Sequence, residues 1–344
     1  MNMKKISAEK YEKNMSYNIH GIIKLESFTE LYELRYFNTG RHSDHPDMHI
    51  GDDISKQTYK ELLCSLQIEP GENMHLGISN LINMSRHVLY VNVVEPLLRL
   101  LLIPKGYALL HLACLEKDGR GIMISAPPDT GKTSCILKCL KANTQHDDMG
   151  ISLLSDDMVI VSKNGDLLSF PKPFTISSHT LDSVFGMDTS LWYKIRSNIH
   201  SKGGRSAYKG MGTMNWLPIM SINALAQIVF EPPKLYPEEL VNVRIGKQAR
   251  PDKLVFLSKD FQGEREMTKD DAVNLIRSNT DNAYITPPYH KIFPKLSIGG
   301  MSYDELIAEE AQITRNLIEN INPVIVGRKD YSWYKYVLNN CIAK

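Results

Sequence analysis

The chain has 344 residues, of which 42% are hydrophobic, so it can form one large domain with an appendage, or two domains, around a substantial core. Lys and Arg number 40 against 39 Asp and Glu, which excludes a protein that binds nucleic acid or an anionic membrane through its overall charge. The five cysteines form no C-x-x-C pair and are odd in number, which disfavours both a zinc site and a disulfide framework.

Residues 1–93 are expected to form a small N-terminal domain that is α/β or rich in strands. The first residues, MNMKKISAEKYEKN, are charged and lack the apolar segment of a secretory signal, so we predict a cytoplasmic protein. Apolar runs over residues 17–25 and 31–37 are typical of strands. His and Asp residues gather in residues 42–53, but their spacing fits no metal site and favours a solvated loop.

Residues 94–300 are predicted to form a nucleotide-binding core. Its first apolar stretch, residues 97–110, is interrupted by Arg99, Pro104 and Lys105, so it falls short of a membrane span. The run 107–114, which contains His111, is typical of a buried strand, and residues 116–121 have the glycines and charges of a hairpin turn. Two antiparallel strands would bring His111 towards the sheet that carries the next segment.

The segment GIMISAPPDTGKTS, residues 121–134, predicts a strand, a phosphate-binding loop and the start of a helix. In the pattern G-x-x-x-x-G-K-[ST], backbone N–H groups surround a polyphosphate, the lysine reaches its β and γ oxygens and the hydroxyl binds Mg²⁺. Ala126 replaces the first glycine, and Pro127 and Pro128 have no N–H to donate. The donors are therefore expected from Asp129, Thr130, Gly131, Lys132, Thr133 and Ser134. The alternative is a strand, turn and helix with a chance GKT.

Two carboxylates, Asp156 and Asp157, interrupt the apolar run 151–161, about two dozen residues after this loop. Paired acids among strands are costly unless a cation or hydrogen-bond donors compensate them. A Walker-B-type metal ligand would stand in this position. The alternative is a tight turn, for which Asp-Asp is ordinary composition. The upstream loop favours the metal site.

A basic, glycine-containing segment follows over residues 181–216. Arg205 and Lys209 within it are predicted substrate contacts, because a mobile basic segment can neutralise charge on a phosphoryl group in transfer. The alternative is an exposed linker with ordinary charges.

Residues 301–344 are predicted to form a C-terminal helical extension. Ser302 and Glu305 form a capping box that begins a helix, and Pro323 would end it. Glu310 interrupts the apolar stripe of this helix, which consists of residues 306, 307, 313, 317 and 321.

His111, the fifteen-residue interval to Ala126, APPDTGKT and LLSDDMVIV together resemble the HPr kinase/phosphorylase family, which shares its kinase core with ATP-dependent phosphoenolpyruvate carboxykinases. Residues 94–102 are similar to the lead-in of HPr kinase-like proteins from peptide-modification gene clusters, such as those for lasso peptides. Residues 209–215 resemble the family's glycine-rich signature, and residues 224–231 the strand after it. The resemblance covers about residues 94–231 and implies an α/β P-loop core with a mixed sheet.

The resemblance implies a kinase that uses ATP, or another nucleoside triphosphate, with Mg²⁺. Lys132 would contact the β/γ-phosphates, Thr133 and Asp157 the metal, and Asp156 would act as the catalytic base. His111 would orient the carboxylates or neutralise charge, although a histidine in an apolar strand is often a core residue with its own partners. The acceptor would be a hydroxyl of a peptide, protein or small metabolite, with a peptide Ser or Thr preferred. No nucleic-acid or membrane partner is expected, and a homo-oligomer is compatible with the sequence.

Two other functions remain open. The first is a catalytically weak, nucleotide-dependent binding or regulatory module, because Ala207 occupies the place of the signature's metal-binding Glu. The second is carboxykinase chemistry on a keto acid. It is disfavoured because the chain is short for that group and has no recognisable oxaloacetate-binding elements.

Overall fold

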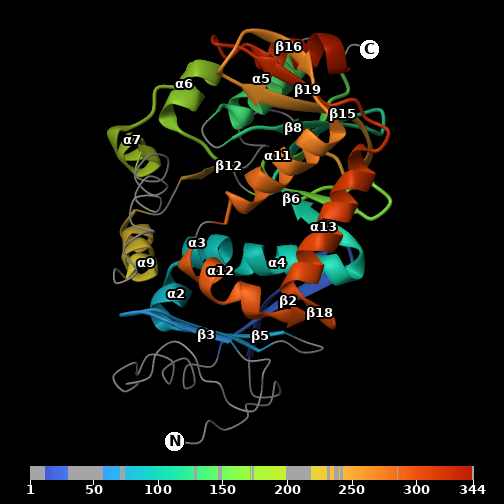
Figure 1. Cartoon of the computed structure of the whole chain (residues 1–344). Coiled ribbons are helices and arrows are strands. Elements are labelled where there is room, and N and C mark those ends of the chain that lie inside the picture. The colour runs from blue at the N-terminus through green and yellow to red at the C-terminus, as the bar shows by residue number, and fades with distance from the viewer. Residues whose placement is uncertain are drawn as a thin grey trace, which may run out of the picture. The chain divides into compact units, whose positions relative to one another are not determined.

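The computed structural model (Figure 1) describes residues 12–29, 57–69, 74–127, 130–145, 149–170, 172, 174–198, 218–230, 233–235, 240, 243–284 and 286–342. The chain forms two compact units. The N-terminal unit comprises Met1–Leu97, Met214–Val229 and Thr286–Tyr303, and the sheet unit comprises Leu98–Thr213, Phe230–Ile285 and Asp304–Lys344. Two segments that the sequence assigns to the core thus group with the N-terminal unit.

The N-terminal unit contains two small antiparallel sheets. In the first, β1 (Glu12–Ile19) pairs with β2 (Ile23–Thr29), so the run 17–25 is two strands and a turn rather than one strand. His20 and Gly21 both have positive φ, which is the geometry of a tight hairpin turn. The second sheet is β3 (Gln57–Lys60), β4 (Ser65–Glu69) and β5 (His75–Ile78). Further elements described in this unit include α2 (Asn80–Met84), α3 (Arg86–Leu89), the π-helical turn Tyr90–Val94, α9 (Ile219–Val229), α12 (Pro287–Lys291), β17 (Ser297–Ile298) and β18 (Met301–Ser302).

The helix α9 corrects one expectation. Residues 224–231 resemble a family strand, but the chain is helical over Ile219–Val229. Ala and Leu are strong helix formers, and Met220 and Ala224 are buried at helical spacing. This part of the resemblance is therefore wrong.

The sheet unit is built on a mixed ten-stranded sheet, which confirms the predicted α/β class with a mixed sheet. The main strand order is β14-β9-β7-β8-β15-β11-β10-β6, and β19 joins β15 and β16. The strands are β6 (Tyr107–Leu110), β7 (Ala113–Lys117), β8 (Arg120–Ser125), β9 (Ser152–Ser155), β10 (Val159–Ser162), β11 (Leu167–Leu168), β14 (Arg244–Ile245), β15 (Gln248–Ser258), β16 (Gly263–Glu266) and β19 (Val324–Gly327). A separate short pair is β12 (Phe174–Thr175) and β13 (Lys234–Leu235).

Helices cover both faces of this sheet (Figure 1). Along β8, Ile122 and Ile124 belong to one core cluster and Met123 to the other, because successive strand residues point to opposite faces. The first cluster includes side chains of α5 (Lys132–Gln145), α6 (Ser178–Phe185), α14 (Trp333–Tyr336) and the π-helical turn Val337–Ile342. The second includes side chains of α11 (Lys269–Asp281) and α13 (Tyr303–Ile318). The other helices of this unit are α4 (Glu95–Leu102), which begins in the N-terminal unit, and α7 (Leu191–Asn198).

The strands β8, β15 and β19 are parallel neighbours in that order. Their carboxyl ends therefore share one edge of the sheet, where ligands of α/β proteins usually bind. The segment predicted as a helical extension thus contributes β19 to the core sheet as well as helices. A Val-Ile-Val run after Pro323 explains this strand, since β-branched residues fit a sheet.

One helical stretch, Arg86–Lys105, is apolar and long enough to cross a membrane, and 61% of its most apolar window is buried inside the protein. Its Arg99 is fully buried and donates from Nε and Nη2 to the two Glu310 oxygens at 2.7 and 2.6 Å. Asp281 adds a third contact at 2.7 Å. The stretch is thus largely packed inside the protein, and the ion pair of Arg99 explains the acid on the apolar stripe of α13.

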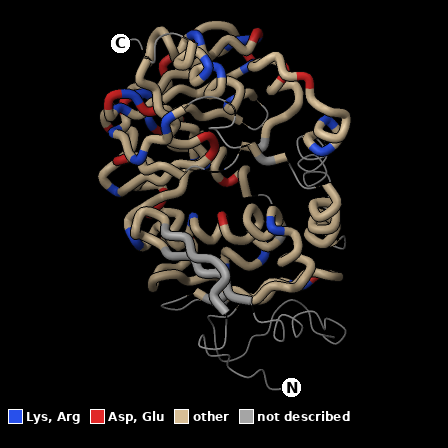
Figure 2. The backbone as a smooth tube through the Cα atoms, turned by 180° about the vertical axis from the view of Figure 1, so that it is seen from behind, with Lys and Arg blue, Asp and Glu red and all other residues tan. Residues whose placement is uncertain are grey.

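Basic and acidic residues are interspersed along the described chain (Figure 2). This distribution agrees with the balanced composition. Recognition of a highly charged ligand would therefore depend on local groups.

Candidate functional site

The predicted strand, loop and helix are all present. β8 ends at Ser125, and α5 begins at Lys132. Gly131 has a φ of 121°, a conformation that favours glycine. Within the described chain, Cys135 is the first residue of α5 whose N–H donates to a backbone carbonyl, that of Gly131 at 2.9 Å. The N–H groups in the first turn of a helix have no acceptor within the helix itself, and such a terminus favours an anion.

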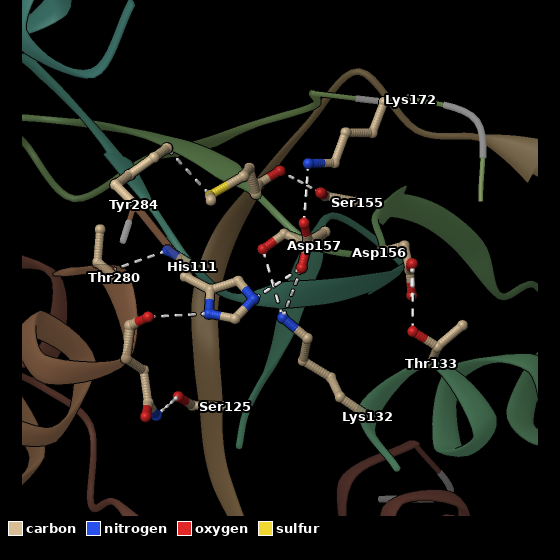
Figure 3. Close-up of polar contacts among 12 residues, drawn as sticks. His111, Ser125, Lys132, Thr133, Ser155, Asp156, Asp157, Lys172, Thr280 and Tyr284 are labelled. Carbon is tan, nitrogen blue, oxygen red and sulfur yellow. Dashed lines mark hydrogen bonds and ion pairs between the residues drawn. The ribbon is translucent and has the colours of Figure 1, made fainter. Parts of the chain in front are cut away.

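The two acids stand in the bend between β9 and β10, as the sequence predicts. The hydroxyl of Ser155 donates to the carbonyl of Met158 across this bend. β9 is the antiparallel partner of β7, and β7 pairs with β8, so the bend lies in the same sheet as the phosphate loop. Both carboxylates meet side chains from the start of α5 (Figure 3).

Asp157 lies among three basic side chains. Its Oδ1 is 2.7 Å from Nε2 of His111 and 3.2 Å from Nζ of Lys132, and its Oδ2 is 2.8 Å from Nζ of Lys172 (Figure 3). Burial would raise the pKa of this carboxyl, but Lys172, Lys132 and His111 together hold its pKa well below the usual range. Asp157 is therefore ionised throughout the physiological range.

His111 lies at a break between two strands rather than inside one. β6 ends at Leu110 and β7 begins at Ala113, and the His111 N–H donates to the Thr280 hydroxyl at 3.1 Å instead of a strand partner. Nδ1 is 3.1 Å from the carbonyl oxygen of Asn279. Burial and then Lys132 lower the pKa of His111, and Asp157 opposes them. The ring thus lies between two oxygen acceptors in a setting that favours its neutral form.

Asp156 has a different environment. Its Oδ2 accepts a hydrogen bond from the Thr133 hydroxyl at 3.3 Å, while no described residue hydrogen-bonds its buried Oδ1. Burial, followed by the charge of Asp157, raises the pKa of Asp156 to about 7. An unpaired buried carboxylate oxygen next to a threonine hydroxyl is a suitable partner for a hard divalent cation.

The residues fit Mg²⁺ that is shared with a phosphate ligand. The described chain contains no group of three or more His, Cys, Asp or Glu side chains that could hold a metal. Mg²⁺ commonly uses one or two carboxylates, with waters and phosphate oxygens completing the octahedron. Thr133 and Asp156 match that requirement, and a cation there would satisfy the unpaired Oδ1.

The described structure thus brings together most of the residues that the sequence singled out. His111, Lys132, Thr133, Asp156 and Asp157 meet, and Thr130, Gly131 and Ser134 belong to the loop and first turn beside them. Asp129, Arg205, Lys209 and Ala207 lie outside the described residues.

Three site residues have no signal in the sequence. Lys172 stands in a Pro-Lys-Pro segment before β12, and Asn279 and Thr280 stand near the end of α11. Asn279 Nδ2 also donates to Ser125 Oγ at 3.0 Å, which ties α11 to the strand before the loop. Lys172 lies between two prolines in the sequence, and this pattern does not indicate a functional role.

The C-terminal segment packs against Gly131 in the loop that follows β8. A Cβ on Gly131 would lie 3.2 Å from Cζ3 of Trp333, which is fully buried. The indole N–H of Trp333 has the carbonyl oxygens of Val326 and Ser258 as acceptors, at 3.0 and 3.2 Å. The indole that packs against the loop glycine is thus fixed to the ends of β15 and β19.

No protein-family model and no curated protein matches this chain. The resemblance to HPr kinases accordingly remains a hypothesis based on the residues quoted above.

Proposed function

We propose that this protein is an ATP- and Mg²⁺-dependent phosphotransferase with an HPr kinase-like P-loop core, which transfers a phosphoryl group to a hydroxyl. The observation that carries the proposal is the pairing of the loop's Thr133 with Asp156 while Lys132 contacts Asp157. A phosphate-loop lysine and hydroxyl facing two carboxylates at one sheet edge is the arrangement that phosphoryl transfer needs. A nucleoside triphosphate other than ATP would fit the same groups.

The nucleotide would be held mainly by the start of α5. The open amides of its first turn would receive the phosphates, and Lys132 would leave Asp157 to contact the β/γ oxygens. Thr133 and Asp156 would hold Mg²⁺, which supplies neutralisation of phosphate charge when it is bound.

The geometry favours a division of labour opposite to the one expected from the resemblance. The Oδ1 of Asp156 has no hydrogen-bond partner among the described residues, and burial beside the charge of Asp157 leaves this carboxylate short of positive charge, which a metal ion would supply. Asp157 remains ionised and is held by His111 and Lys172 after Lys132 departs, so it would orient the acceptor hydroxyl and accept its proton. Lys172 would also lie near the transferred group and counter its charge.

The acceptor class follows from the resemblance alone, with a peptide Ser or Thr as the leading candidate over a protein or metabolite hydroxyl. The cytoplasm stays the predicted compartment. The first test is calorimetry with Mg²⁺ and ATP, ADP or GTP. The second is the intact mass of candidate acceptors after incubation with ATP and Mg²⁺, which should rise by one phosphoryl group. Absence of nucleotide binding would overturn the proposal.

A catalytically weak nucleotide-binding module is the second candidate. One observation favours it. Asp157, the carboxylate proposed as the base, contacts three basic side chains at once, those of His111, Lys132 and Lys172. Nucleotide binding without transfer to any acceptor, and with the same nucleotide consumption in the wild type and Asp156→Asn, would favour this function over the kinase.

A further inference from the structure

The loop after β19 also lies at this edge of the sheet, and the proposed phosphate site gives it no role. The loop after β19 carries Tyr331, and a Cβ on Gly131 would lie 3.5 Å from its Cδ1 atom. Because β8, β15 and β19 are parallel neighbours, this loop and the phosphate loop follow strands that end at the same edge. An aromatic ring thus stands directly beside the glycine of the phosphate loop.

The ring is held in place although much of it is exposed. Tyr331 has a φ of 60°, which side chains other than glycine adopt at a cost of about 1 kcal/mol. Asp330 accepts hydrogen bonds from the N–H and hydroxyl of Ser332 at 3.2 and 2.7 Å, and these fix the turn. Tyr331 nevertheless remains 46% exposed. A large aromatic side chain in a costly conformation, with half its surface in water, gives little to the core.

Two neighbours fix the orientation of the ring. Trp333 meets it nearly at right angles, with centroids 5.3 Å apart and an interplanar angle of 83°. Nζ of Lys259, just after β15, lies 4.8 Å from the ring centroid. The edge contact with Trp333 and the ammonium of Lys259 favour one orientation of the ring. Tyr331 therefore offers a flat aromatic surface in a fixed position.

We propose that Tyr331 is the stacking platform for the base of the bound nucleotide. This inference rests on the proposed function, because it requires the phosphates to lie at the start of α5. The nucleoside would then extend along the strand edge past Gly131 towards the loop that follows β19. Base stacking on an aromatic ring is tolerant of base identity, so the ligand class is a nucleoside di- or triphosphate with a flat base, adenine and guanine included.

Trp333 and Tyr331 divide the structural and binding roles. Trp333 is buried and both contacts of its N–H are with backbone carbonyls, so its removal would damage the fold. Tyr331 can be truncated with a smaller effect on the core, which makes it suitable for a binding test. Trp192 on α7 is a matched control, since it is an exposed aromatic residue of the same unit, 53% exposed and packed on Phe230.

The test compares Mg·ADP with Mg·tripolyphosphate by isothermal titration calorimetry. The proteins are the wild type, Tyr331→Ala, Tyr331→Phe and Trp192→Ala, and thermal unfolding checks that each is folded. We expect Tyr331→Ala to bind ADP about tenfold more weakly, with unchanged tripolyphosphate affinity, because only ADP carries a base. Tyr331→Phe and Trp192→Ala should bind both ligands as the wild type does.

The outcomes separate this inference from the proposed function. If the wild type binds ADP and Tyr331→Ala binds it equally well, the platform is wrong while nucleotide binding stands. Equal losses for both ligands would also overturn the platform, since they indicate damage to the phosphate loop. If the wild type binds neither ligand, the proposed function fails and the platform with it.

Discussion

His111 and Asp157 are 46 positions apart in the chain, and their side chains meet with Nε2 2.7 Å from Oδ1. The other ring nitrogen faces the Asn279 carbonyl oxygen at 3.1 Å. Two acceptors favour a doubly protonated ring, whereas burial and Lys132 favour the neutral one. Whatever removes Lys132 from this group therefore shifts the balance towards the protonated ring.

Nucleotide binding should accordingly take up a proton, because the lowered pKa of His111 would rise towards its ordinary value. Lys132 would turn to the phosphates, one cause of the lowered His111 pKa would vanish, and the imidazole would bind a proton between its two acceptors. Calorimetry of ADP binding in buffers of different ionisation enthalpy measures this uptake. It should disappear in His111→Gln. Equal uptake in that variant would assign the proton to another group.

Asp157→Asn should reduce phosphoryl transfer by about 10²- to 10⁴-fold, because the Asp157 carboxylate would act on the acceptor hydroxyl. Nucleotide affinity should stay within a fewfold of the wild type. Lys172→Ala should lower kcat in the same direction through the loss of its contact with Asp157. Steady-state kinetics with the acceptor, and calorimetry with ADP, separate the two effects. A variant that loses ADP binding as completely as transfer would contradict this role.

Asp156→Asn should make the unliganded protein more stable at pH 8, by up to about 4 kcal/mol, and leave stability unchanged near pH 4. The pKa of Asp156 is raised from 3.8 to about 7, so the folded protein holds a proton that the unfolded chain has already lost. Wild-type stability is therefore lost between about pH 4 and pH 7. Urea unfolding across this range measures it.

The exposed Asp182→Asn, which leaves Asp156 in place, is the matched control and should follow the wild-type profile of stability against pH. With Mg²⁺ and ADP present, the order should reverse at pH 8, because the wild-type carboxylate would then have its cation and Asp156→Asn would bind ADP more weakly. An unchanged order would remove Asp156 from the metal site.

Gly131→Ala should cost about 2 kcal/mol and abolish nucleotide binding, since its Cβ would meet Trp333 at 3.2 Å in a backbone conformation that alanine avoids. Gly119→Ala separates strain from contact. Gly119 also has a positive φ of 76°, but a Cβ there meets nothing within 4 Å, so we expect about 1 kcal/mol and normal binding. Equal costs would show that the tryptophan can move aside.

Glu310→Gln should destabilise the protein by about 3–5 kcal/mol, because it leaves the buried Arg99 without its two-point carboxylate partner. Glu319→Gln, on an exposed position after the same helix, should change stability by less than about 0.5 kcal/mol. Replacing both members of the pair with apolar residues should restore much of the loss. Denaturant unfolding of the three variants is the measurement.

The sequence predicted the local elements of the site well, since their signals are local. The strand before the loop, the helix at Lys132, the acid-bearing bend and the helix after Ser302 each follow from residues within one element. The break at His111 could not be predicted, because the apolar run 107–114 is the same for one strand or two. The His111 N–H donates to the hydroxyl of Thr280, 169 positions away, and this bond replaces a bond to a neighbouring strand.

Long-range partners were missed for the same reason. Lys172 reaches Asp157 from an irregular segment, and Trp333 reaches Gly131 from beyond the last strand, with no pattern in the sequence to mark either. The helix over Ile219–Val229 was mistaken for a strand because family resemblance outweighed its Ala and Leu content.

The packing of Trp333 against Gly131 has a consequence for biosynthesis. During translation, β8 and α5 emerge from the ribosome long before β19 and Trp333. At that stage Gly131 lacks the indole against which it packs. We expect the nascent chain to become able to bind nucleotide in one late step, when β19 pairs with β15.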